Sequence, residues 1–128
     1  MTDPARGSGD LTGRLVGDID SDLAEFLRTR ANTFLKWDLV RFFHENPHTA
    51  DTAENIGRYA GRDAIAIANE LREMAGDGVL DTHFLGDMAI YTLTENRETR
   101  ALIARFIEAC QDRTFKVKAV YQVIRGMR

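Results

Sequence analysis

Cysteine is almost absent from this chain of 128 residues: Cys110 is the single one, so an internal disulfide is excluded and nothing in the cysteine content indicates export. Long apolar runs are missing too, since none approaches the roughly 20 residues that a membrane-spanning helix needs. The first 20 residues contain no apolar segment of the kind found in secretory signals. We therefore expect a cytoplasmic protein that has no membrane contact.

The sequence also has little of what enzymes and metal sites need. We find no phosphate-binding glycine loop, no dinucleotide-binding glycine pattern and no nucleophile elbow. His44 and His48 have the i, i+4 spacing of a helical metal site, but Pro47 lies between them and ends the predicted helix. Cys110 falls on the apolar face of a predicted helix, which favours a core residue over a redox sensor. We expect no catalytic residue, no metal and no cofactor.

Lysine and arginine are scarce in most of the chain. Residues 1–96 hold 9 Lys/Arg against 17 Asp/Glu, whereas residues 97–128 hold 8 Lys/Arg against 3 Asp/Glu. The chain is thus an acidic body followed by a basic segment. The segment could contact phosphate or an acidic partner, but we favour a solvated helix face that complements the acidic body.

Apolar spacing predicts mostly helices. Residues 1–20 have no apolar period and predict a flexible arm. Helices are predicted over 22–30 and 33–45, as two helices or as one helix broken near residues 30–32. An extended link then leads to a helix over 53–60, which Asp51 or Thr52 caps and Gly61 closes. Asp63 caps the next helix, over 64–75.

The remaining elements are a hairpin and C-terminal helices. Residues 79–93 alternate like two strands around a turn at Gly86-Asp87. Thr94 is predicted to cap a helix over 95–111. The stretch "TFKVKAVYQVIRG" fits a strand or a helix, and we favour a helix because another strand would have no obvious neighbour.

The segment "TAENIGRYAGRDAIAIANELREMAGDGVL", followed by "YTLT", resembles the winged-helix domains of bacterial and archaeal transcription regulators, broadly the MarR-like and ArsR-like groups. The matching positions are Leu71, Met74, Gly78, Val79, Leu80, Tyr91, Leu93 and Thr94. The resemblance implies a mainly α fold, a winged helix-turn-helix with helical extensions at both ends. It implies one domain over 21–128, with a core over 33–94 and a C-terminal extension over 95–128.

The resemblance further implies a dimeric DNA-binding transcription regulator whose helix 64–75 enters the major groove. Arginine and asparagine suit guanine and adenine edges, so Arg62, Asn69 and Arg72 would specify the sequence. Arg58 would hold phosphate, and Arg62, which is also near the turn, could do the same. The candidate contacts at the start of the helix and along it are Arg62, Asp63, Ala64, Ala66, Asn69 and Arg72. The expected partners are double-stranded DNA and a second copy of the chain.

The alternative is a winged-helix module that binds a protein partner and not DNA. Residues 33–94 hold 5 Lys/Arg against 10 Asp/Glu, and the predicted wing over 81–90 contains two aspartates and no Lys or Arg. Phosphate neutralisation supplies much of DNA affinity, so this composition favours the alternative. For the dimer, we expect residues 22–30 and 95–124 to form a two-fold interface, or else to pack on their own domain.

Overall fold

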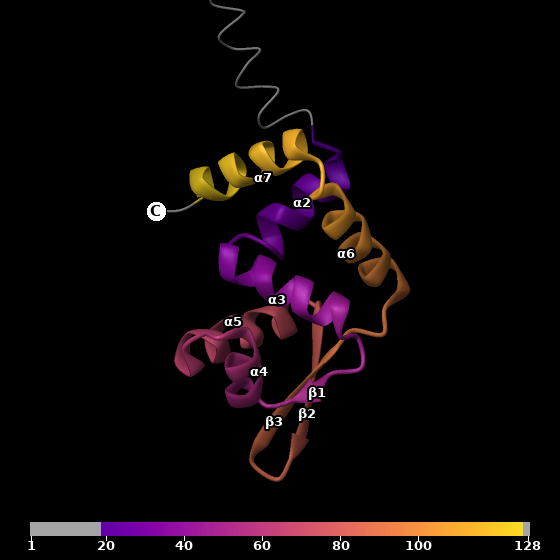
Figure 1. The fold of residues 1–128 in the computed structure, drawn as a ribbon. Helices are drawn as coiled ribbons and strands as arrows, with labels where there is room; N and C mark the ends of the chain where they lie inside the picture. Colours follow the sequence, from indigo (N-terminus) through magenta and orange to yellow (C-terminus); the bar gives the residue numbers. More distant parts are fainter. Residues whose placement is uncertain (1–18, 127–128) are drawn as a thin grey trace, which may run out of the picture.

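The computed structural model describes residues 19–126, and these form six helices and a three-stranded antiparallel sheet (Figure 1). The helices are α2 (Ser21–Thr29), α3 (Phe34–Glu45), α4 (Ala53–Ala60), α5 (Ala64–Gly76), α6 (Arg97–Ala109) and α7 (Arg113–Gly126). The strands are β1 (Ala50–Asp51), β2 (Leu80–Leu85) and β3 (Met88–Leu93). The expectation of a mainly helical chain with a hairpin is confirmed. Residues 1–18 of the predicted arm lie outside the described part.

Polar side chains begin the helices close to where the sequence predicts. Asp20, Thr33 and Thr52 cap α2, α3 and α4. The predicted cap of α6 is wrong, because Asn96 and not Thr94 accepts from the first-turn amides, through Oδ1 and the Thr99 N–H at 2.8 Å. Thr94 is still tied to the end of the sheet, since its N–H donates to the Val79 carbonyl at 3.1 Å.

The link before α4 contains a strand that the sequence did not predict. Ala50 pairs with Thr92 and Asp51 pairs with Tyr91, so β1 lies on the free edge of β3 and the sheet order is β1-β3-β2. A two-residue strand is too short to show a period in the sequence, and only the partner strand makes it recognisable. The hairpin itself has the predicted turn, with Gly86 at φ 63° between Leu85 and Met88.

The C-terminal stretch is helical, as favoured, and α7 lies across α2 at the end of the molecule opposite the hairpin (Figure 1). The helices α2 and α3 are separate. The apolar face of α2, formed by Leu23, Phe26 and Leu27, is buried within the chain. Part of this face packs against Phe106 of α6, whose ring lies 5.3 Å from that of Phe26. This face of α2 therefore packs on its own chain and is not available for a two-fold interface.

We expect Gly61→Ala to lower the free energy of unfolding by about 1 kcal/mol, because left-handed backbone disfavours a Cβ. Gly61 ends α4 at φ +68°, and no heavy atom lies within 4 Å of an added Cβ, so the backbone alone sets the cost. Gly76→Ala is the matched control: it has equal space and no positive φ, and we expect it to stabilise the protein by about 0.5 kcal/mol. Urea unfolding measures the change in the free energy of unfolding for both variants. If the two changes have the same sign, the cost assigned to the left-handed backbone at Gly61 is contradicted.

Candidate nucleic-acid interface

The candidate interface is built on the close packing of α4 against α5. A Cβ on Gly57 would lie 3.3 Å from the Arg62 carbonyl oxygen and 3.4 Å from Cγ1 of Ile67, so glycine lets the two helices approach. Asp63 begins α5 by accepting from the Ala66 N–H at 3.1 Å. The predicted capping role of Asp63 is thereby confirmed, and its carboxylate is used within the chain.

The helix α5 has one buried face and one exposed face. Ile67, Leu71 and Met74 are buried against the rest of the chain. The exposed positions include those predicted from the sequence, Arg62, Asp63, Ala64, Ala66, Asn69 and Arg72, together with Ile65 and the acidic Glu73. Ile65 is 74% exposed and was not predicted as a contact, although its place on the face opposite Ile67 follows from helical spacing.

A groove of about 420 Å³ separates the start of α4 from the exposed face of α5. Asn69 and Arg72 line it together, and the Arg72 Nη1 donates to the Asn69 Oδ1 at 3.0 Å. Glu54 of α4 lines the same groove and adds an acid to it. The structure therefore brings together two of the predicted base-contacting residues and places a carboxylate beside them.

Each of the other two predicted arginines has an acidic partner. Arg58 lies 3.3 Å from Glu54, one helical turn away, and both side chains are more than two-thirds exposed. Arg62 pairs with Asp38 of α3. Exposed pairs of this kind contribute about 0–1 kcal/mol, so either guanidinium can exchange its carboxylate for a phosphate at small cost.

The tip of the hairpin is apolar. The side chains of Phe84, Leu85 and Met88, which we name the hairpin tip, are 73%, 66% and 50% exposed. No Lys or Arg lies between residues 81 and 90 to contact a phosphate backbone. The alternating pattern identified these residues as strand, but it could not show that both faces of the tip point into solvent.

An exposed aromatic side chain at the end of α4 was also missed. Tyr59 is 65% exposed and stacks on Phe42, with ring centroids 6.2 Å apart. Its hydroxyl donates to Oδ2 of Asp51 at 3.3 Å. The pKa of Asp51 is lowered, first by a hydrogen bond from the Asn55 side chain and then by the Thr52 N–H. Tyr59 thus has one stacking partner and one hydrogen-bond partner at the end of α4.

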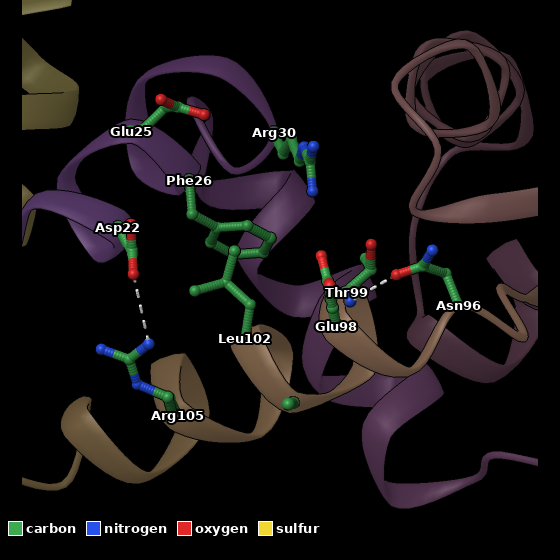
Figure 2. Close-up of a pocket in the computed structure, with 10 residues that line it drawn as sticks. Asp22, Glu25, Phe26, Arg30, Asn96, Glu98, Thr99, Leu102 and Arg105 are labelled. Atoms are coloured by element: carbon green, nitrogen blue, oxygen red, sulfur yellow. Dashed lines mark hydrogen bonds and ion pairs between the residues drawn. The ribbon is translucent and has the colours of Figure 1, made fainter.

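Away from this surface, a cleft of about 560 Å³ separates α2 from α6 (Figure 2). Phe26 and Leu102 lie between the two helices, and the charged side chains stand around them (Figure 2). Arg105 pairs with Asp20 at 3.1 Å and Asp22 at 3.8 Å. Asn96, which also lines the cleft, serves as the cap of α6. Arg105 and Asn96 therefore have structural roles within the chain.

Within residues 19–126, no three His, Cys, Asp or Glu side chains are grouped so that they could hold a metal ion. Cys110 is buried, and burial raises the pKa of its thiol, which agrees with a core residue. Over the same residues, no helix has both the length and the apolar content needed to cross a membrane.

Comparison with protein-family models, with curated proteins and with solved structures finds no match to this chain.

Proposed function

We propose that residues 33–94 form a winged helix-turn-helix and that the chain is a DNA-binding transcription regulator. The observation that carries the proposal is the order of elements: α3, β1, α4, a tight turn, α5 and the hairpin β2–β3, with the sheet order β1-β3-β2. This order leaves α5 with an exposed face, and that face carries Arg62, Asn69 and Arg72. In this function α5 enters the major groove, and the N-terminal half of its exposed face contacts base edges.

The local charges determine how such binding works. Arg58 and Arg62 would exchange Glu54 and Asp38 for phosphates, while Arg72 and Asn69 would turn from each other to base edges. The acids remain nearby, so each new contact competes with an existing one. We therefore expect binding that needs two copies of α5, one turn of DNA apart, on a dimer. Val117 and Ile124 of α7 are large apolar residues of the proposed two-fold interface that remain exposed in the described part of the chain.

The first experiment is fluorescence anisotropy of a random-sequence duplex titrated with the full chain, at low and at near-physiological salt. The proposal expects binding that weakens steeply with salt, because phosphate contacts release counterions. An absence of binding at low salt and high protein concentration would reject it. Selection of a preferred duplex follows a positive result.

On a selected duplex, we expect Arg72→Ala to cost about 1–3 kcal/mol and to relax the preference at one base pair. Arg58→Ala should weaken binding to all sequences about equally and reduce the slope of log K against log salt by about 1. Arg41→Ala is the control, since Arg41 is an exposed arginine of α3 that lies on the side of Cys110. If Arg72→Ala and Arg58→Ala give the same sequence-independent loss, the assigned roles are wrong.

The hairpin tip favours a second candidate function, a winged-helix module that binds a protein. Phe84, Leu85 and Met88 are exposed where a DNA-binding wing would carry a cation. Apolar side chains clustered at a surface are typical of protein-binding sites. The anisotropy experiment separates the two candidates when it includes the Arg58→Ala and Arg72→Ala variants, because duplex binding through the basic segment 97–128 alone would not respond to these changes.

A further inference from the structure

The strand β2 forms one edge of the sheet. The order β1-β3-β2 leaves one side of β2 without a neighbouring strand in the described chain. All six residues of β2 pair with β3 in an unbroken register, whereas β1, at the other edge, pairs through two residues only. The hairpin also projects beyond α4 and α5 (Figure 1). One edge of the sheet is thus short, and the other offers a complete strand.

The turn and the register determine which main-chain groups point to the free side of β2. The two residues that flank a two-residue turn exchange both main-chain hydrogen bonds, and bonded and non-bonded pairs then alternate along the ladder. The Thr94 N–H donates to the Val79 carbonyl at 3.1 Å, which continues this alternation at the far end. The N–H and carbonyl groups of Thr82 and Phe84 therefore point away from β3, and none has a hydrogen-bond partner among residues 19–126.

This edge lacks the features that usually prevent pairing with another strand. Such features are a bulge, a proline or a lysine, and residues 80–85 contain none of them. Thr82 is half-buried and Phe84 is exposed, so the described chain encloses neither residue. The unpaired groups of the edge match those of one more strand, which is how extended peptides add to a sheet.

The charge near the edge indicates which kind of strand fits. Asp81 precedes Thr82, Asp87 lies in the turn, and no Lys or Arg occurs between residues 81 and 90. Neither carboxylate has an ion-pair partner in the described part of the chain. Two copies paired along this edge would bring like charges together, which is unfavourable, so the charge favours a basic segment of another protein.

We propose that the free edge of β2 binds an extended segment of a partner protein as a fourth strand of the sheet. The main chain of the segment pairs with Thr82 and Phe84. Its centre is apolar and covers Phe84 and Leu85, and a Lys or Arg at each end pairs with Asp81 or Asp87. This inference rests on the second candidate function, protein binding, and does not depend on binding of DNA.

The test is titration of the full chain, without DNA, with the amidated peptide Lys-Ile-Val-Thr-Val-Lys, labelled with fluorescein at its N-terminus and followed by anisotropy. In antiparallel pairing with its last lysine opposite Asp81, its two valines lie opposite Thr82 and Phe84. We expect saturable binding, and replacing both lysines by glutamate should weaken it about tenfold or more. Absence of saturation up to about 1 mM peptide, or equal binding of the glutamate peptide, would overturn the proposal.

Methylated peptides distinguish strand pairing from adhesion of side chains. N-methylation of the two valines removes the N–H groups that face β2, whereas N-methylation of the isoleucine and threonine removes as many from the opposite side. The first change should weaken binding about tenfold or more, and the second should have little effect. Equal effects of the two changes would show that the peptide does not pair as a strand, which would overturn the proposal.

Variants of Thr82 locate the site on the chain. Thr82→Pro removes the outward N–H, and proline is compatible with an edge strand whose N–H faces solvent, so β2 keeps its pairing with β3. We expect peptide binding to weaken about tenfold or more, while Thr82→Ala, which keeps the N–H, should bind nearly as the parent does. Circular dichroism checks that both variants are folded. Undiminished binding in Thr82→Pro would overturn the assignment, and the methylated peptides decide it if that variant does not fold.

Two further measurements separate this proposal from the others. Sedimentation of the chain alone should show no association that Thr82→Pro abolishes. If it does, a second copy occupies the edge, and the choice of a partner protein is wrong. Arg58→Ala and Arg72→Ala, which test DNA binding, should leave peptide binding unchanged, so the failure of either proposal is seen independently of the other.

Discussion

Replacing Phe106 by alanine is expected to lower the free energy of unfolding by about 3–5 kcal/mol, the usual cost of truncating a buried phenylalanine. Phe106 of α6 is 1% exposed, and its ring contacts Phe26 of α2, Trp37 of α3 and Phe115 at the start of α7. The ring therefore joins four helices. Since domains of this kind are stable by only about 5–15 kcal/mol, the change removes a large part of the total.

Urea unfolding followed by the fluorescence of Trp37, the single tryptophan, and by far-UV circular dichroism measures this effect. Phe84→Ala is the matched control, because Phe84 is 73% exposed at the hairpin tip. We expect it to change the free energy of unfolding by no more than about 0.5 kcal/mol. A loss below about 1 kcal/mol for Phe106→Ala would show that the four helices do not depend on a common aromatic cluster.

Replacing Lys36 by methionine is expected to lower the free energy of unfolding by about 3 kcal/mol. Lys36 is 2% exposed, and its ammonium group donates to Asn32 and Glu73 and pairs with Glu70. Without it, Glu70 keeps a carboxylate that is only 19% exposed and has no cation. Glu73 is 63% exposed and returns to water, so we take the lower end of the range for broken buried pairs.

The control for this change is Lys116→Met, which removes the same charge from an exposed position of α7 and should be nearly neutral. A second variant identifies the cause. Adding Glu70→Gln to Lys36→Met neutralises the stranded carboxylate and should recover about 1 kcal/mol or more of the loss. If the double variant is no more stable than Lys36→Met, the cost comes from packing of the lysine stem and not from the buried charge.

Much of the secondary structure could be predicted because its signals are local. Asp63 caps α5 through an N–H three residues away, and Gly86 supplies the positive φ of a two-residue turn. The helical spacing of Ile67, Leu71 and Met74 determined which face of α5 is buried, and hence that Arg62, Asn69 and Arg72 are exposed. The candidate DNA-contacting face was therefore available from the sequence. Whether that face binds DNA is the proposal that the anisotropy experiment tests.

Other features depended on partners far along the chain. The strand β1 exists because Ala50 and Asp51 meet β3. The later start of α6 depends instead on a local contact that the prediction missed, since Asn96 accepts from the Thr99 N–H. Nothing near Lys36 indicates that its ammonium group pairs with Glu73, 37 residues away. The burial of Lys36 was not predicted, and no local feature of the sequence identifies the acids that compensate its charge.

By itself, the sequence determined the helices, the hairpin and the exposed side of α5, because capping, turn geometry and apolar period act over a few residues. The tertiary structure alone decided which charges meet and which polar atoms remain without partners. Gln122 is 98 residues from Ala24, and its amide orientation depends on that contact. A cavity beside it exists only where α2, α5 and α7 come together, since burial and hydrogen-bond satisfaction are properties of the packed chain and not of any segment.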